Sequence, residues 1–103
     1  MGQIAKISSK NLPSGKGMCT EIEGKRIAVF NVNGKYYAMD EECPHAGGPL
    51  SEGDIDGNEV ICPWHGAGFN LETGEVTNGP AKTGVRTYAV HVEGDEIKID
   101  VGS

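Results

Sequence analysis

The sequence predicts an all-β protein in which an antiparallel β base carries an inserted, loop-rich lobe. Three observations lead to this prediction. Glycine supplies 16 of the 103 residues, which is typical of short strands joined by tight turns. Apolar and polar residues alternate along the last part of the chain, as they do in half-buried strands. Finally, Asn33-Gly34 lies between two apolar segments and is a strong hairpin signal, because both positions of such a turn need positive φ.

The first forty residues supply most of the predicted base. Residues 25–32 are apolar almost without a break, so we expect a strand that is central or buried on both faces. The segment 11–17 contains Pro13, Gly15 and Gly17 and is expected to be a loop. The sequence predicts four strands in this part of the chain, at 4–7, 18–23, 25–32 and 35–40.

The middle of the chain, residues 41–80, is irregular and rich in glycine. Gly47-Gly48-Pro49 excludes a helix or a central strand. The segments 54–56 and 59–61 flank Gly57-Asn58 and predict a small hairpin. Its two ends are expected to bring the loops on either side of it together.

The last third returns to clean alternation and predicts a closing hairpin. Tyr88, Val90 and Val92 share one face, and Gly94-Asp95 turns the chain toward the alternating segment 97–101. We expect this hairpin to pack against the N-terminal strands. No convincing amphipathic helix and no run of 18 apolar residues is found. The expected organisation is one domain over residues 1–103, with the lobe 41–80 inserted in a base of 1–40 and 81–103.

The chain is acidic, with 9 Lys and Arg against 15 Asp and Glu and a formal net charge of −6. This charge argues against nucleic acid as a partner, because phosphates need cationic neutralisation. It fits either steering toward a basic protein surface or solubility alone. The first residues lack the apolar core of a signal peptide, and Cys19 has no obvious partner, so we expect a reducing cytoplasm. Cys19 itself is expected to be a small buried hydrophobic residue.

Two Cys-His pairs dominate the lobe: Cys43-Pro44-His45 and, after sixteen residues, Cys62-Pro63-Trp64-His65. Two thiolates and two imidazoles suit a cluster of two chemically different irons, with both cysteines on one iron and both histidines on the other. Zinc also binds Cys2His2 sets, but its usual order in sequence groups the cysteines together and the histidines together. A disulfide between the two cysteines is the other alternative, and it leaves the histidine spacing without a reason.

At these residues the sequence resembles the Rieske family, and the likeness extends over nearly the whole chain. The resemblance implies the Rieske fold and one 2Fe-2S cluster held by Cys43, His45, Cys62 and His65. The glycines near the ligands, Gly47 and Gly66 among them, then allow backbone N–H groups to approach the sulfides, or they serve only to make turns. An apolar docking rim would be formed by Trp64, Pro49 and Pro80, although Trp64 is also compatible with core packing.

The resemblance also bears on the reduction potential. High-potential Rieske proteins carry a disulfide between the ligand loops, and Gly48 and Trp64 occupy the matching positions here. Those proteins also carry a serine and a tyrosine whose hydroxyls bond the cluster, where this chain has Ala67 and Phe69. Because this chain lacks the disulfide and both hydroxyls, we expect its reduction potential to lie near the low end of the Rieske range, at about −150 mV.

Soluble, low-potential chains of this kind resemble Rieske-type ferredoxins. In that family they pass one electron at a time from a flavoprotein reductase to a terminal oxygenase, often an aromatic-ring dioxygenase. We therefore expect a monomeric, cytoplasmic electron carrier and not an enzyme. The oxygen-activating iron of Rieske oxygenases needs two His and a carboxylate, and only His91, expected to be exposed and without a role, remains after the cluster ligands.

Two alternatives stay open at this point. The small subunit of cytoplasmic nitrite reductase has the same fold, although many of its members lack the ligands. A zinc-binding interaction module would use the same four side chains.

Overall fold

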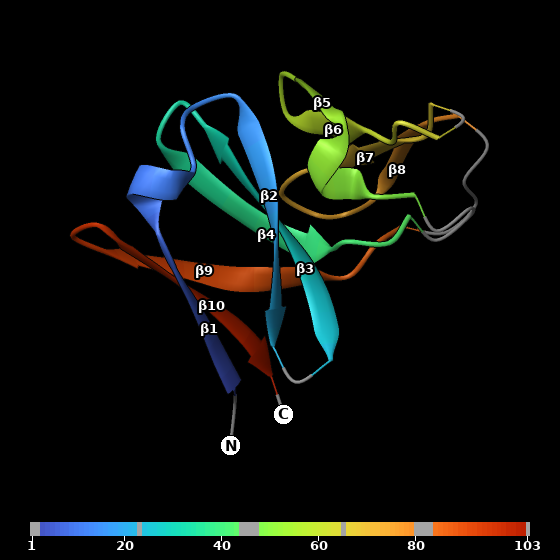
Figure 1. Ribbon diagram of the computed structural model, residues 1–103. Helices are drawn as coiled ribbons and strands as arrows, with labels where there is room; N and C mark the ends of the chain where they lie inside the picture. Colours follow the sequence, from blue (N-terminus) through green and yellow to red (C-terminus); the bar gives the residue numbers. More distant parts are fainter. Residues whose placement is uncertain (1–2, 23, 44–47, 65, 80–83, 103) are drawn as a thin grey trace.

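The structure is a computed structural model that describes residues 3–22, 24–43, 48–64, 66–79 and 84–102. Within these ranges the chain contains ten strands and two short 3-10 turns, η1 (Ser9–Asn11) and η2 (Leu50–Glu52), and it contains no α-helix. The strands form two antiparallel sheets, which confirms the predicted all-β class. Figure 1 shows the smaller sheet beside the larger one, at the upper right of the view.

The larger sheet has six strands in the order β1-β10-β9-β4-β3-β2. It combines the first forty residues with the last part of the chain, because the C-terminal hairpin packs against the N-terminal strands as expected. Gln3 pairs with Gly102 at one end of the β1–β10 ladder, and Ala38 pairs with Tyr88 where β4 meets β9. The strands are β1 (Gln3–Ser8), β2 (Lys16–Ile22), β3 (Lys25–Val32), β4 (Lys35–Asp40), β9 (Thr87–Glu93) and β10 (Glu96–Gly102).

The smaller sheet has four strands in sequential order, and it lies within the segment that separates β4 from β9. Its first two strands form the hairpin predicted around Gly57-Asn58, and Gly57 has the positive φ (61°) that the turn needs. The strands are β5 (Asp54–Asp56), β6 (Glu59–Ile61), β7 (Gly68–Asn70) and β8 (Val76–Asn78).

Strand β3 connects the two cores of the molecule. Ile27 and Val29 face one core, and Ala28 and Phe30, on the opposite face, belong to the other. All four side chains are fully buried, which confirms the expectation of a strand buried on both faces. The first core is formed mainly by side chains of the six-stranded sheet: Ala5, Leu12, Ile27, Val29, Ala38, Ile97, Ile99 and Val101. The second joins that sheet to the lobe: Ala28, Phe30, Met39, Cys43, Leu50, Val60, Cys62, Ala67, Phe69, Leu71 and Val85.

The β3–β4 hairpin turns as the sequence predicts. Asn33 and Gly34 have φ values of 53° and 91°, and they join Val32 directly to Lys35 in the register of the ladder. The outer strands β1 and β2 also contact each other, so the six-stranded sheet curls toward closure (Figure 1).

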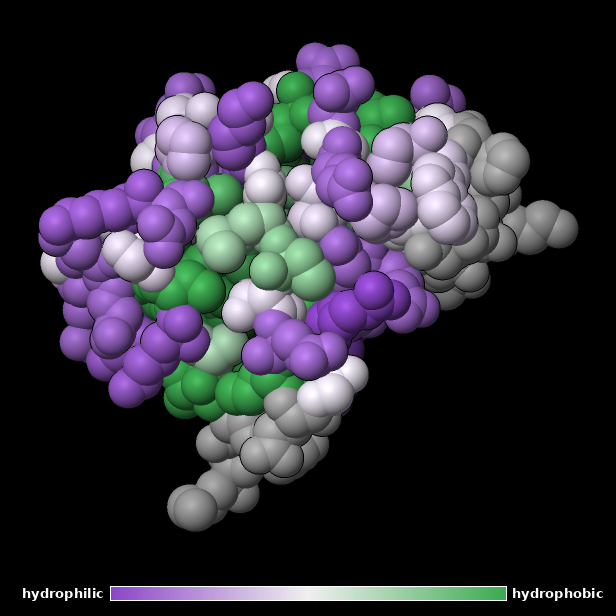
Figure 2. Space-filling model, in the orientation of Figure 1, coloured by the Kyte–Doolittle hydropathy of each residue, from purple (hydrophilic) through white to green (hydrophobic). Residues whose placement is uncertain are grey.

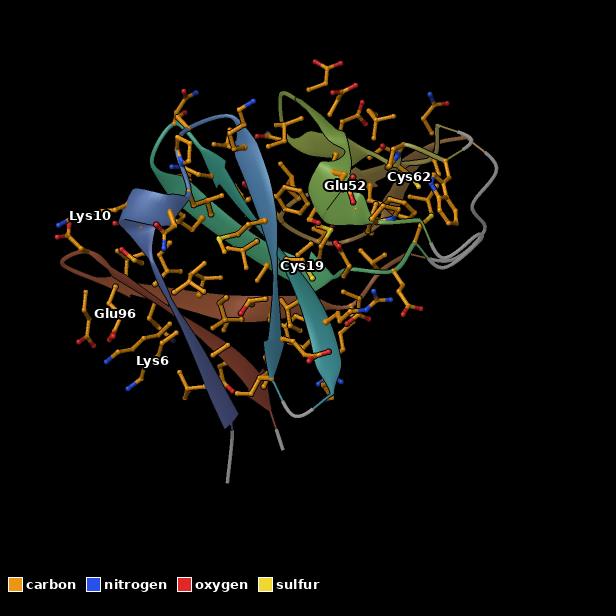
Figure 3. The ribbon with its side chains drawn as sticks, in the orientation of Figure 1. Lys6, Lys10, Cys19, Glu52, Cys62 and Glu96 are labelled. Carbon is orange, nitrogen blue, oxygen red and sulfur yellow. The ribbon has the colours of Figure 1, made fainter. Side chains whose placement is uncertain are left out.

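Strand β2 differs from the prediction in where it begins and in the exposure of Cys19. It starts at Lys16, inside the predicted loop, because Gly17 serves for close packing and not for a turn: a Cβ there would lie 2.7 Å from the carbonyl oxygen of Ser51. Cys19 is exposed, so the expectation of a buried residue was wrong. Since β2 is an edge strand, Cys19 lies at the rim of the sheet, where Figure 3 labels it. Figure 2, in the same orientation, shows that some hydrophobic residues are exposed on this side of the molecule.

The described part of the chain holds no helix with the length and apolar character needed to cross a membrane.

Candidate metal centre

Two short hairpins present the predicted cysteine ligands. Residues 41–43 run antiparallel to 48–50, with Glu42 and Pro49 forming an isolated bridge. The backbone N–H of Cys43 donates to the carbonyl of Gly48 (2.9 Å), five residues further on. Cys62, which follows β6, makes the same bond to Ala67 (2.7 Å). Each ligand loop is therefore closed at its base by the amide of its own cysteine.

The two loops lie against each other. Gly48 is buried, and a Cβ placed on it would be only 2.8 Å from Sγ of Cys62 and 3.1 Å from Cβ of Trp64. The hairpin β5–β6 thus brings the two loops together, as the sequence predicts. The contact between Gly48 and Trp64 also shows that the positions matched with the disulfide of high-potential proteins are neighbours in this chain. The three cysteines, all within the described ranges, form no disulfide.

The thiols of Cys43 and Cys62 are both almost fully buried, at 1% and 2% exposure. Burial raises the pKa of the Cys62 thiol, the amide of Trp64 lowers it, and the adjacent Cys43 thiol raises it again. The amide N–H of Trp64 donates to Sγ of Cys62 at 3.4 Å. A metal displaces the proton of a cysteine ligand and binds the side chain as a thiolate. The donor set and the N–H···S contact therefore fit an iron–sulfur cluster.

The remaining predicted site residues divide into two groups. His45, His65, Gly47 and Pro80 lie outside the described residues. Of the others, Trp64 is 50% exposed, Pro49 is partly buried, and Gly66 is exposed with a positive φ of 76°.

Trp64 is half exposed and does not belong to either buried core. Gly68, another glycine near Cys62, belongs to β7, and a Cβ there would meet Thr77 Oγ1 at 2.6 Å. Close packing between β7 and β8 accounts for this glycine.

Ala67 and Phe69, the positions without hydroxyls, are fully buried in the core that surrounds the two thiols. This core is apolar and continues into the six-stranded sheet through Phe30 and Met39. The cysteine side of the centre is thus shielded from water, while Trp64 lies at the surface. Figure 3 shows Cys62 in the lobe, well separated from Lys6, Lys10 and Glu96 on the base.

Sequence reasoning missed one buried acid next to the site. Glu41 is only 5% exposed, and its carboxylate accepts hydrogen bonds from the amide (2.8 Å) and the hydroxyl (2.7 Å) of Ser51. Its neighbour Glu42 is exposed and pairs with Arg26 at 2.6 Å. The two acids are adjacent in sequence, and only the fold of residues 48–52 over Glu41 distinguishes them.

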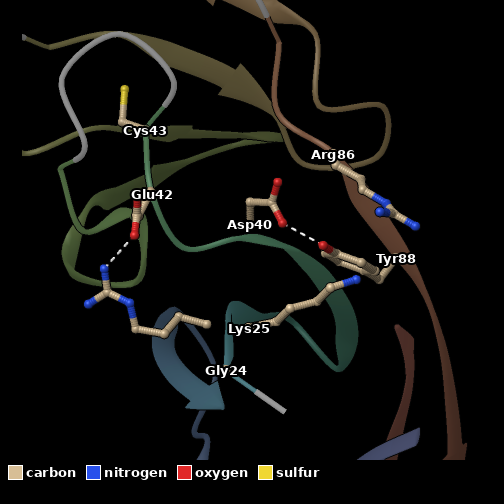
Figure 4. A pocket seen from close by; sticks show the side chains of 8 residues that line it. Gly24, Lys25, Asp40, Glu42, Cys43, Arg86 and Tyr88 are labelled. Carbon is tan, nitrogen blue, oxygen red and sulfur yellow. Dashed lines mark hydrogen bonds and ion pairs between the residues drawn. The ribbon is translucent and has the colours of Figure 1, made fainter. Parts of the chain in front are cut away.

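An open cleft of about 600 Å³ lies beside the root of the first ligand loop (Figure 4). Within it Tyr88 donates a hydrogen bond to Asp40, and the guanidinium of Arg86 lies over the Tyr88 ring at 5.1 Å. Burial, followed by the hydrogen bond to Asp40, raises the pKa of Tyr88 to about 12. The lining residues are Gly24, Lys25, Arg26, Asp40, Glu42, Cys43, Arg86 and Tyr88.

Comparison with known proteins gives a consistent result. The profile of the Rieske [2Fe-2S] domain matches residues 3–89. The ferredoxin component of the naphthalene 1,2-dioxygenase system of Pseudomonas aeruginosa is 33% identical over 98 residues, covering 95% of this chain and 94% of that protein. The 3-phenylpropionate/cinnamic acid dioxygenase ferredoxin subunit of Escherichia coli (strain K12) is 36% identical over 102 residues, covering 98% of this chain and 95% of the relative.

Solved structures share the fold. A chain from the complex of reduced oxygenase and oxidized ferredoxin in carbazole 1,9a-dioxygenase superposes with a TM-score of 0.87 at 27% identity, covering 94% of this chain and 92% of that one. A putative NADH-dependent nitrite reductase small subunit from Mycobacterium tuberculosis gives the same TM-score at 20% identity, covering 97% and 96%. The second likeness shows the fold alone.

Proposed function

Because this chain belongs to the Rieske [2Fe-2S] family, we propose that it is a one-electron carrier that passes electrons from a flavoprotein reductase to a terminal oxygenase. The observation that carries this proposal is the identity of 33–36%, over nearly the full length, to ferredoxin components of aromatic dioxygenase systems. An aromatic-ring dioxygenase is the proposed acceptor, and the cytoplasm is the proposed location. The role is that of an electron-transfer component and not of an enzyme that binds substrate.

We assign the four ligands as the sequence predicts them: Cys43 and Cys62 on one iron, His45 and His65 on the other. The 2Fe-2S cluster supplies a one-electron redox couple when it is bound. The protein contributes the dry, apolar surroundings of the two cysteines and the N–H donor of Trp64 to Sγ of Cys62. Both features tune the potential, because hydrogen bonds to sulfur and solvent exposure are its main determinants besides cluster charge.

Trp64 is the proposed centre of the docking surface. It is one of three large hydrophobic side chains exposed in the described part of the chain, and it immediately precedes the ligand His65. Pro49 and Pro80 are proposed to complete the apolar rim, and Gly47 and Gly66 to let amides approach the cluster. Exposed aromatic side chains of this kind are enriched at the centres of protein interfaces.

The nitrite reductase alternative is supported by fold only. The TM-score of 0.87 to that small subunit equals the score to the carbazole dioxygenase ferredoxin, so backbone similarity does not separate the two roles. The sequence favours the carrier, since the dioxygenase ferredoxins are 33–36% identical and the nitrite reductase subunit is 20% identical. Metal analysis decides between the cluster and the zinc-binding alternative.

The first test is direct. Anaerobically purified protein is expected to contain two irons and two acid-labile sulfides, to show a Rieske-type EPR signal after reduction, and to titrate at about −150 mV. It should then carry electrons from a ferredoxin reductase to an aromatic-ring dioxygenase in a reconstituted assay. Protein that contains zinc and stays EPR-silent would contradict the cluster, and a midpoint above about +100 mV would contradict the interpretation of Ala67 and Phe69.

A Trp64→Ala variant tests the docking surface in the same assay. We expect unchanged cluster spectra and slower reduction by the reductase, because the side chain is half exposed and contributes little to the core. Val92→Ala is a matched control, since Val92 is also about half exposed (47%) but lies on β9 of the base. Loss of the cluster in Trp64→Ala would show a packing role, and equal rates in the two variants would remove Trp64 from the interface.

A further inference from the structure

The open cleft of about 600 Å³ beside the first ligand loop has no role yet in the proposed function. Its middle is lined by the chain that leaves β4, and its two walls are the start of β3 and the segment that leads into β9. Backbone hydrogen bonds fix this arrangement. The amide of Glu41 donates to the carbonyl of Arg26 (3.1 Å), and the amide of Asp40 donates to the carbonyl of Arg86 (3.0 Å). The cleft therefore lies where three strands of the base meet the root of the lobe.

Both walls of the cleft carry positive charge. Lys25 and Arg26 begin β3 on one side, and Arg86 precedes β9 on the other. Arg86 is exposed and Lys25 is partly buried, and Figure 4 shows their side chains above and below the Tyr88 ring in this view. Cationic groups from two distant parts of the sequence thus line the same open space.

The acids of the cleft are engaged by other partners. Glu42 forms an ion pair with Arg26 (2.6 Å), and Asp40 accepts the hydrogen bond of Tyr88, as the dashed lines in Figure 4 mark. Within the residues that the structure describes, neither of the other two cations forms an ion pair. With three cations against two carboxylates, the lining is net positive and its wall charges are available to an anionic ligand.

This positive cleft contrasts with the rest of the molecule. The chain has a formal net charge of −6, and residues 41–80 contain eight acids and no Lys or Arg. The molecule as a whole therefore repels an anionic ligand, and only a local group of cations can hold one. A general excess of positive charge cannot explain anion binding by this protein.

We propose that the cleft receives an acidic segment of a redox partner, whose carboxylates pair with Lys25 and Arg86 on the two walls. This inference rests on the proposed function, because it takes the occupant to be a protein that exchanges electrons with the cluster. The same partner would face the negative lobe with a basic surface. The two contacts, of opposite sign, together define how it is oriented.

The shape and the chemistry of the cleft favour a protein segment over a small anion. Its volume lies in the range of sites that hold molecules of drug size, which is far larger than one phosphate. Its available cations lie on two separate walls, and an extended peptide with neighbouring acidic side chains can reach both. Arginine also binds carboxylates in a bidentate manner. Ion pairs at such an open site act mainly on the rate of association and on orientation.

The position of the cleft connects it to electron transfer. Cys43, a proposed ligand, is one of the lining residues, and its amide donates to the carbonyl of Gly48 (2.9 Å). Gly48 in turn lies against Trp64, since a Cβ placed on it would be 3.1 Å from Cβ of that side chain. A partner centred on Trp64 is therefore close enough to extend a surface segment into the cleft.

The first experiment uses the isolated, cluster-loaded protein and a fluorescent hexaglutamate peptide at about 0.1 M salt, where charges more than about 10 Å apart are largely screened. The wild type should bind the peptide although both molecules are acidic. Lys25→Gln/Arg86→Gln should weaken binding by about tenfold, or about 1.4 kcal/mol.

A matched control removes the same charge elsewhere. Lys16 and Lys35 are exposed and begin β2 and β4, at the ends of these strands that lie away from the cleft. Lys16→Gln/Lys35→Gln should weaken peptide binding by less than about twofold, because the removed charges are screened from the cleft. Iron content and the visible spectrum check that each variant is folded and loaded.

Inorganic phosphate provides the small-anion arm of this experiment. If the cleft accommodates a protein segment, phosphate should displace the peptide only at an ionic strength at which sodium chloride does so as well. Displacement at a much lower ionic strength would show a small-anion site and would overturn the assignment to a protein partner.

The second experiment measures electron transfer by stopped flow with the reductase and with the oxygenase. Lys25→Gln/Arg86→Gln should slow association with at least one of them by about tenfold, while its midpoint potential stays at the wild-type value. The control Lys16→Gln/Lys35→Gln should keep both association rates within about twofold of the wild type. If the cleft double variant does not retain iron, Lys25→Gln alone replaces it, with an expected effect of about threefold.

Absence of peptide binding by the wild type, or equal effects of the two double variants, would overturn the proposal. Unchanged association rates with both redox partners would overturn it too. These outcomes differ from a failure of the proposed function. A protein that binds the peptide through the cleft but transfers no electrons keeps the anionic site and loses the carrier role, whereas normal electron transfer that ignores the cleft substitutions keeps the carrier role and loses the site.

Discussion

At the scale of single residues, the ligand loops leave little freedom around the two cysteines. Gly48 has no side chain because Sγ of Cys62 and the Trp64 side chain occupy the space where a Cβ would lie. The sequence indicates a glycine-rich loop but not which glycine is required for contact. A thiol that serves as a ligand cannot move aside as a flexible surface chain does, so Gly48 is the most constrained glycine described in these loops.

Gly48→Ala should therefore reduce cluster occupancy strongly. The new methyl group would lie 2.8 Å from Sγ of Cys62, and the loops would have to separate to accept it. Iron content per chain and the visible absorption of the purified variant measure the effect. Gly68→Ala is the control, since its Cβ would meet Thr77 Oγ1 at 2.6 Å and not a ligand atom. Similar iron loss in both variants would show a general effect on folding.

At the scale of elements, the sequence predicted most strands because their signals are local. Asn33-Gly34 specifies its own turn, and the alternation at 97–101 specifies one buried face. The features that were missed depend on tertiary contacts. Gly17 was interpreted as a turn residue because the approach of Ser51 cannot be read from the chain, and the exposure of Cys19 follows from the edge position of β2.

The same limit applies to the candidate site. The ligand spacing alone pointed to Cys43 and Cys62, and the structure places both in one buried cluster. Glu41 and Glu42, by contrast, are identical in type and adjacent, so no sequence signal separates the buried acid from the exposed one. Their difference arises when η2 folds back over residue 41 and contributes Ser51.

The contact between β4 and β9 makes a prediction about pH. Tyr88 on β9 donates to Asp40 on β4, and its pKa is raised to about 12 from an ordinary value near 10. The folded protein therefore holds this proton more tightly than the unfolded chain. The resulting stability is fully present below pH 10 and is lost as the pH rises toward 12.

Tyr88→Phe should remove this part of the pH dependence. Urea unfolding at pH 9 and at pH 11.5 should show a larger loss of unfolding free energy for the wild type than for the variant. Tyr36→Phe is the control, because Tyr36 is a partly buried tyrosine on β4 without a described hydrogen bond to a carboxylate. Parallel losses in all three proteins would refute the role of the Tyr88 hydroxyl.

At the scale of the whole molecule, charge is divided unevenly between base and lobe. All nine Lys and Arg residues lie outside residues 41–80, and that segment contains eight of the fifteen acids. The lobe that holds the cysteine ligands is therefore strongly negative, while the base is slightly positive. Such a distribution orients an approaching basic partner toward the lobe before contact.

Electron transfer to the proposed partners should accordingly slow as salt is added. Charge attraction raises association rates at low ionic strength and is screened at high ionic strength. The double variant Asp54→Asn/Asp56→Asn, on the exposed strand β5 of the lobe, should weaken the salt dependence measured by stopped-flow reduction. The control Asp95→Asn/Glu96→Gln removes two charges from the β9–β10 end of the base. Equal salt slopes in the two double variants would show that net charge alone matters.

The pairing of Gln3 with Gly102 has a practical consequence. Gln3 and Gly102 are partners at the end of the β1–β10 ladder, and Figure 1 shows this end of the ladder on the side away from the lobe. A short peptide can therefore join them, and new ends can be opened in the β9–β10 turn, where Gly94 is exposed and a Cβ would meet no neighbouring atom. Circular permutation or fusion at this point would leave the ligand loops untouched.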